Sequence, residues 1–89
     1  MARVFFSPHF SKHVAVETEK VAGETVAEAL ESAFTRHPTL RGYVLDDQGA
    51  VRKHVMIFVD DEFLADRKEL SDPVSTESEI HVMQALSGG

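Results

Sequence analysis

The sequence predicts an α+β domain in which one amphipathic helix packs on one face of a mixed β-sheet. Three observations lead to this fold class. The 89 residues have room for one modest hydrophobic core. Runs rich in β-branched and aromatic residues come before and after a single helical pattern. A helix and a sheet that each carry one apolar face can bury both against each other, and a chain of this size can build that arrangement.

The chain begins with a predicted antiparallel hairpin. In residues 3–6, Arg3 is followed by three β-branched or aromatic residues, and Pro8 then interrupts the pattern. Residues 14–19 resume it, with valine or threonine at every second position. Two such runs separated by a short polar segment are typical of paired strands.

A helix is predicted over residues 25–36. Thr25 is a good N-cap, and Glu28 three residues later completes a capping box. Apolar residues then recur at helical spacing, at Val26, Leu30, Ala33 and Phe34. Pro38 ends the helix, because the residue before a proline is disfavoured in the α region.

Two strands should follow the helix, over residues 43–45 and 51–59, on either side of a turn at residues 46–49. In the longer arm the alternation places Val51, Lys53, Val55, Ile57 and Val59 on one face and Arg52, His54, Met56 and Phe58 on the other. Residues 60–62 are a predicted turn.

The last strand is predicted over residues 79–85, after a polar stretch in which Pro73 rules out a central strand. Ile80 and Val82 should face the helix, so that Met83 points to the opposite face. The predicted order is β-β-α-β-β-β. Residues 1–86 should form the domain, and residues 87–89 should be a free tail.

The composition excludes several classes of function. The chain has no cysteine, which excludes a disulfide framework, a catalytic thiol and thiolate metal ligands. Its net charge is −6, from 15 acidic and 9 basic residues, which disfavours direct nucleic-acid binding. That charge suits solubility, or docking onto a basic partner. No signal-peptide pattern and no apolar stretch of about 20 residues is present, so we expect a cytoplasmic protein without a membrane span.

No metal site is expected. His9 and His13 are four residues apart but lie in a predicted strand–loop region, where that spacing does not guarantee a shared face. The other histidines are isolated in the sequence. The acidic residues at positions 46–47 and 60–62 lack the oxygen-ligand spacing of a calcium loop, and capping of turns accounts for them.

The C-terminal Gly88-Gly89 pair is the most informative motif. Glycines have no Cβ atoms, so such a tail can thread a narrow channel and present its carboxylate to a buried active site. A frayed terminus is the alternative for the dipeptide alone. Its position directly after a last predicted strand favours a working tail.

The order of elements, the closing run IHVMQALSGG (residues 80–89) and the run HVMIFVDDE (residues 54–62) resemble the small ubiquitin-like β-grasp sulfur carriers. That family includes the small subunit of molybdopterin synthase, the thiamine-pathway carrier and the cysteine-biosynthesis carrier. The closing run is also similar to tRNA-thiolation carriers. The resemblance spans nearly the whole chain, and no motif in it is specific to one pathway.

The resemblance implies a carrier and not an enzyme, with Gly89 as the working residue of a tail that includes Ser87 and Gly88. A ubiquitin-activating-type adenylyltransferase would adenylate Gly89 with its own ATP and Mg²⁺, so this chain would bind no cofactor. A sulfur donor would then form a thiocarboxylate, and a sulfur-accepting enzyme would use it.

The resemblance also implies a partner-facing apolar position six residues before the terminal glycine, at Met83. Leu86 would anchor the tail, and Met56 and Phe58 would add to the partner-binding surface. Core packing is the alternative for Met56, Phe58 and Met83. The chain departs from the family in the loop at residues 7–13, after the first strand.

Two other functions stay open. The chain could be a protein modifier, joined through Gly89 to a lysine of another protein. It could also be a non-catalytic binding module with an inert tail, docking through the face that carries Met56 and Phe58.

Overall fold

The computed structural model describes residues 1–7 and 18–84. Its elements in chain order are β1 (Ala2–Phe6), β2 (Thr18–Val21), α2 (Val26–Arg36), α3 (Pro38–Val44), β3 (Val55–Val59), β4 (Glu62–Phe63) and β5 (Glu79–Gln84). Residues 14–17 of the predicted second strand lie outside the described residues. None of the helices in the described ranges is long and apolar enough to cross a membrane.

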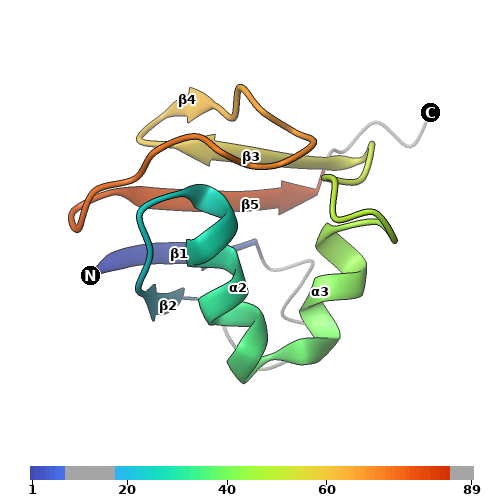
Figure 1. Ribbon diagram of the computed structural model, residues 1–89, viewed down its shortest axis with the longest axis horizontal. Coiled ribbons are helices and arrows are strands. Elements are labelled where there is room, and N and C mark those ends of the chain that lie inside the picture. The colour runs from blue at the N-terminus through green and yellow to red at the C-terminus, as the bar shows by residue number, and fades with distance from the viewer. Residues whose placement is uncertain (8–17, 85–89) are drawn as a thin grey trace.

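The strands form one mixed sheet in the order β2-β1-β5-β3-β4 (Figure 1). The last strand, β5, is central: it runs parallel to β1 and antiparallel to β3. The predicted antiparallel pairing of the first two strands is confirmed, with Ala2 opposite Val21, but β2 extends to Val21, two residues beyond the predicted end of the second strand.

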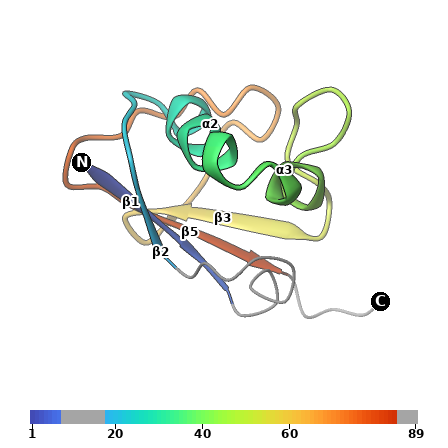
Figure 2. The same ribbon diagram turned by 90° about the horizontal axis from the view of Figure 1, so that it is seen from below.

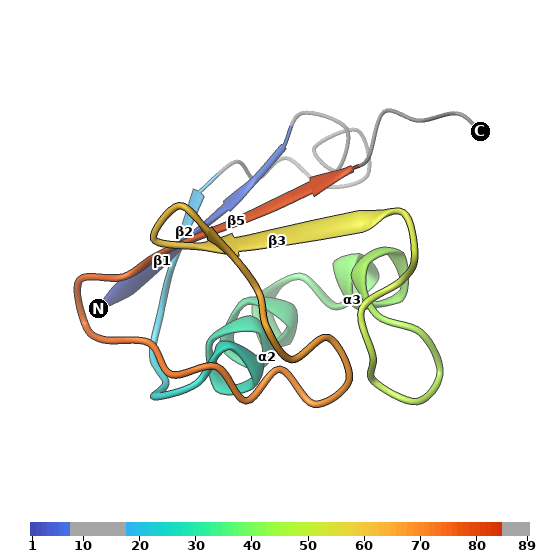
Figure 3. The same cartoon turned by 90° about the horizontal axis from the view of Figure 1, so that it is seen from above.

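Both helices cover the same face of the sheet, as Figures 2 and 3 show from opposite sides. The inward-facing strand residues Val4, Val55, Ile57, Ile80 and Val82 are almost completely buried. They form one core cluster with Leu30 and Phe34 of α2 and Leu40 and Val44 of α3. The predicted α+β class, with a helix on one face of a mixed sheet, is therefore confirmed.

Helix α2 confirms the prediction for residues 25–36. Its N-cap is Thr25, whose Oγ1 accepts a hydrogen bond from the backbone N–H of Glu28 at 3.2 Å. The carboxylate of Glu28 reaches back to the N–H of Glu24 at 2.9 Å. The helix ends at Arg36, two residues before Pro38. Local capping chemistry thus defines both ends of this helix.

The prediction of a strand at residues 43–45 is wrong. Helix α3 (Pro38–Val44) occupies most of this segment, and only Leu45 forms an isolated bridge with Val51. Pro38 is at the start of the helix, where its missing N–H costs nothing. Leu40 and Val44, four residues apart, are both fully buried against the core. The observed order is therefore β-β-α-α-β-β-β.

The predicted long strand over residues 51–59 is shorter than expected, because β3 begins at Val55. Residues 53–54 are in a turn, so Lys53 is exposed and not on the buried face. The Arg67 guanidinium stabilises this turn: its Nη2 donates to the carbonyls of Arg52 and Val55 at 2.7 and 2.8 Å.

The predicted turn at residues 60–62 is two residues long. Asp60 and Asp61 have φ angles of 49° and 70°, and Glu62 already belongs to β4. Two central residues with positive φ match the right-handed twist of the flanking strands. Pro73 lies outside the named strands and makes an isolated bridge with Thr25, in agreement with its predicted exclusion from a central strand.

Candidate functional site

The candidate site is the sheet face that neither helix covers, called the outer face below. On β5, Ile80 and Val82 are fully buried, whereas Met83 is 41% exposed. Successive strand residues point to opposite faces, so His81 and Met83 belong to the outer face. The predicted orientation of Met83 is confirmed.

Met56 and Phe58 share this face. They alternate along β3 with the buried Val55 and Ile57 and are themselves half-buried. In the β3–β5 pairing Met56 is opposite Met83. The core-packing alternative therefore fails for Met83, and Met56 and Phe58 are partly accessible beside it.

A row of rings crosses four adjacent strands on the outer face. It consists of Phe5 on β1, His81 on β5, Phe58 on β3 and Phe63 on β4, and each ring is in register with the next. The Phe5 and His81 rings are stacked, with centroids 4.6 Å apart and planes 7° from parallel. The Phe58 and Phe63 rings are also 4.6 Å apart, tilted by 36°. We call this set the ring row.

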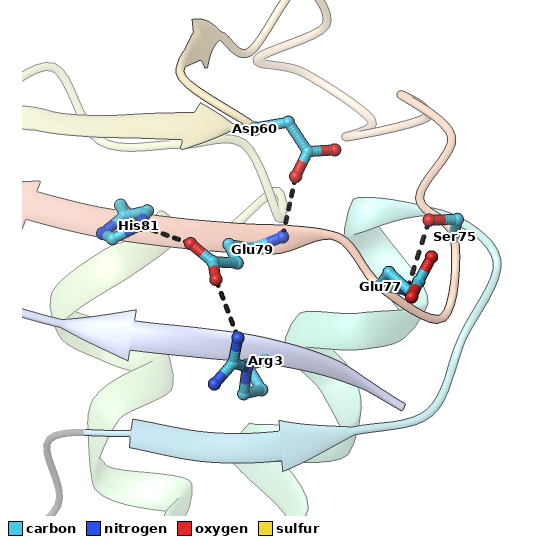
Figure 4. A network of polar contacts seen from close by, with 6 residues as sticks. All are labelled: Arg3, Asp60, Ser75, Glu77, Glu79 and His81. Atoms are coloured by element: carbon cyan, nitrogen blue, oxygen red, sulfur yellow. Dashed lines mark hydrogen bonds and ion pairs between the residues drawn. The ribbon is translucent and has the colours of Figure 1, made fainter.

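One end of the outer face is polar (Figure 4). The Glu79 carboxylate accepts a hydrogen bond from Arg3 Nη2 at 2.7 Å and lies 3.8 Å from His81 Nε2. The Asp60 carboxylate accepts the backbone N–H of Glu79 at 2.9 Å. We call this the hairpin end of the sheet, because the β3–β4 turn is located there.

The opposite end, called the tail end, is where β5 stops. Gln84 is the last described residue, and it pairs with Val55 at the start of β3. Leu86 and the predicted tail residues Ser87, Gly88 and Gly89 lie outside the described residues. Met56 and Met83 are one residue pair away from this end, so the apolar part of the outer face is next to the position from which the tail starts.

A loop carboxylate, Asp66, has a pKa below its ordinary value. The backbone N–H of Glu69 and the Ser71 hydroxyl, with further N–H groups of Ser71 and Lys68, hold the pKa of Asp66 at about 2 instead of 3.8. These groups all belong to the Asp66 loop, where they satisfy the carboxylate. Within residues 1–7 and 18–84, no group of three histidine or acidic side chains is placed to hold a metal ion.

The outer face is chemically suited to docking. Phe63 is 69% exposed and Met83 is 41% exposed, and both adjoin half-buried apolar side chains. Contiguous exposed apolar surface of this kind marks interaction sites in soluble proteins. Methionine adapts to more than one partner surface because it is flexible and polarizable.

Sequence reasoning did not single out Phe5 and Phe63 for this face; the alternation along the last strand places His81 on it, but no partner-binding role was assigned to His81. The alternation of buried Val4 and Phe6 around Phe5 was a usable signal in residues 3–6. Phe63 required knowledge of the turn length, since only a two-residue turn at positions 60–61 brings it opposite Phe58.

Comparison with known proteins gives both a family match and structural neighbours. The ThiS family model matches residues 9–89. The chain is similar to a chain in the crystal structure of the Amycolatopsis orientalis BexX/CysO complex, with a TM-score of 0.87, 18% identity and full coverage of both chains. No curated protein sequence matches significantly.

Two further structures are similar. SAMP1 from Haloferax volcanii aligns with a TM-score of 0.81 and 23% identity, over 99% of this chain and 98% of that one. CysO from Mycobacterium tuberculosis aligns with a TM-score of 0.84 and 15% identity, over 97% and 100%. At these identities the likeness shows the fold, which is the ubiquitin-like β-grasp.

Proposed function

The chain belongs to the ThiS family of ubiquitin-like β-grasp sulfur carriers, and on that premise we propose that it carries sulfur on the C-terminal carboxylate of Gly89. Family membership makes it a ubiquitin-like sulfur carrier or modifier. The proposal adds the chemistry at Gly89 and the partners that perform it.

The proposed chemistry has two steps. A Gly89 carboxylate oxygen attacks the α-phosphorus of ATP in an adenylating partner, and pyrophosphate leaves. Sulfide from a donor then attacks the acyl carbon, AMP leaves, and the product is a thiocarboxylate. ATP and Mg²⁺ belong to the partner, which also stabilises the developing charge and excludes water. The chain itself needs only an accessible carboxylate and a surface that the partner recognises.

The observation that supports this proposal is the position of the apolar part of the outer face beside the end of β5, the last described strand. The apolar residues Met56 and Met83 lie at the end of the sheet from which the chain continues towards Gly89. Five residues follow Gln84, and five extended residues span at most about 17 Å. A partner docked on Met83 can therefore receive Gly89 in an active site about that far away.

The sulfur enters one of the pathways that such carriers serve. These are the synthesis of molybdopterin, thiamine or cysteine, and the thiolation of tRNA. The second candidate is a protein modifier, in which Gly89 forms an amide with a lysine of another protein. The chain shares its fold with SAMP1 from Haloferax volcanii, a small archaeal modifier protein, and this likeness supports the second candidate. Both share the adenylation step and differ only in the acceptor.

Intact mass spectrometry separates the candidates. The chain is incubated with ATP, Mg²⁺, a sulfide donor and the ubiquitin-activating-type enzyme of the source organism. A carrier gains one oxygen-to-sulfur exchange at Gly89, whereas a modifier gives high-mass conjugates in a lysate. A variant lacking Gly89 should support no ATP–pyrophosphate exchange. Normal exchange by that variant would refute both candidates and leave a binding module with an inert tail.

A further inference from the structure

The turn at the tail end of the sheet is basic. Residues 52–54, called the basic turn below, are Arg52, Lys53 and His54. They directly precede Val55, which pairs with Gln84, the last described residue of β5. The basic turn therefore lies beside the position at which the chain leaves the sheet for the tail (Figure 1).

Some basic side chains of this region are held by hydrogen bonds, and others are exposed. Arg52 Nε donates to the Gly42 carbonyl at 2.7 Å, and the Arg67 guanidinium is held on the carbonyls of Arg52 and Val55. These contacts hold the turn in place. Lys53 and His54 are exposed, and within the described ranges neither side chain makes a hydrogen bond or an ion pair.

The nearby carboxylates do not neutralise Lys53. Asp46 lies beside the basic turn, but its Oδ1 accepts the backbone N–H groups of Gln48 and Ala50 at 2.8 and 3.0 Å. Asp47 is exposed in the same turn as Asp46. Acidic side chains gather at the opposite, hairpin end, at Asp60, Asp61, Glu62, Glu77 and Glu79. Within the described residues, an unpaired cation is thus found beside the end of β5 in a chain of net charge −6.

The shape of this region also suits a partner side chain. Asp46, Val51 and the basic turn line an open groove of about 330 Å³. Val51 is buried, at 7% exposure. The groove therefore offers a short apolar wall and a cationic rim, which fit an aspartate or glutamate side chain.

We propose that the basic turn is a second contact for the proteins that take the tail, and that it recognises carboxylates beside the opening of their tail channel. The inference rests on the proposed function and adds a partner chemistry to it. Partner carboxylates attract the tail end and repel the hairpin end, so the carrier approaches with its tail first. Complementary charges of this kind raise association rates and set orientation.

Charge reversal with a matched control tests the proposal. Lys53→Glu reverses the charge in the basic turn. Lys20→Glu makes the same change in net charge on β2, far from the tail end. Lys20 is exposed and is opposite Arg3 in the register of β1 and β2. For each protein the KM for the carrier and the kcat are measured by ATP–pyrophosphate exchange with the activating enzyme, at about 0.05 M and about 0.5 M salt. Thermal melting confirms that both variants fold.

Lys53→Glu should raise KM about tenfold at low salt and no more than about twofold at high salt, with kcat unchanged, because salt screens the contact. Lys20→Glu should stay within about twofold of wild type at both salts. Equal KM values for the two variants would overturn the inference alone. A lower KM for Lys53→Glu would also overturn it and would assign the groove to the chain's own tail carboxylate. Absence of exchange by the wild-type protein would overturn the proposed function together with the inference.

Discussion

Met56 and Met83 are directly opposite each other in the antiparallel pairing of β3 and β5, on the sheet face that neither helix covers. Directly paired side chains on one face have Cβ atoms about 5 Å apart, so the two methionines are neighbours on this face. The surface is located at the end of the sheet from which residues 85–89 continue. The proposed docking surface is therefore beside the last described residue before the proposed tail.

Met83→Asp should leave the melting temperature within about 2 °C of wild type but weaken binding to the activating enzyme about tenfold or more. The new carboxylate is solvated in the free protein and loses its water in the complex. Melting and affinity are measured on one preparation. Ile80→Asp, on the buried face of the same strand, is the control and should unfold the domain. A Met83→Asp variant with wild-type affinity would exclude Met83 from the interface.

Phe63→Ser should weaken the same binding about three- to tenfold if the ring row contacts the partner. Because Phe63 is 69% exposed, its truncation should change stability little. Phe63→Leu keeps apolar area and should lose less affinity than the serine variant. Isothermal titration calorimetry of the three proteins gives the comparison, and equal affinities would limit the docking surface to Met56, Phe58 and Met83.

Leu30→Ala and Phe34→Ala should each lower the free energy of unfolding by about 2–5 kcal/mol. Both side chains are at most 3% exposed and face the sheet from α2. Glu31→Ala on the exposed side of α2 loses only a surface ion pair with Arg41 and should cost about 0.2–1 kcal/mol. Urea denaturation of the three variants checks these values. Similar midpoints for Leu30→Ala and Glu31→Ala would contradict the core assignment.

Two glycines should respond oppositely to alanine. Gly23 has φ +147°, and a Cβ there would lie 2.8 Å from the Ala29 backbone nitrogen, so Gly23→Ala should destabilise the domain. Gly42 lies in α3, and a Cβ there meets nothing within 4 Å. Gly42→Ala should therefore stabilise the domain by about 0.5–1 kcal/mol, since alanine favours the helix. Opposite shifts in melting temperature are expected, and shifts of the same sign would be inconsistent with this geometry.

Asp66 should contribute to acid unfolding. Its pKa is about 2 in the folded chain and 3.8 in the unfolded reference, so the unfolded state binds a proton first as pH falls. The stabilisation is present above about pH 4 and is lost as pH falls towards about 2. Asp66→Asn should flatten the dependence of stability on pH in that window, measured by urea denaturation at several pH values. An unchanged pH profile would show that the Asp66 hydrogen bonds contribute nothing to folding.

Elements with strong local signals were predictable from the sequence. The capping residues Thr25 and Glu28, with Pro38 beyond the end, placed α2 to within one residue. Strict alternation in residues 79–85 placed Ile80 inside and Met83 outside. Signals of this kind act through neighbouring residues, so they do not depend on the rest of the fold. The Gly88-Gly89 motif is equally local, and it indicates the proposed function from the amino-acid sequence alone.

Only the tertiary structure decided the secondary structure of residues 38–45 and which side chains make up the outer face. A short apolar segment is compatible with helix or strand, and burial of Leu40 and Val44 against the core selects the helix. The ring row depends on the parallel pairing of β1 with β5, which brings Phe5 onto His81 from opposite ends of the chain. Pairing between strands distant in sequence is selected by packing of the whole core, and no short segment encodes it.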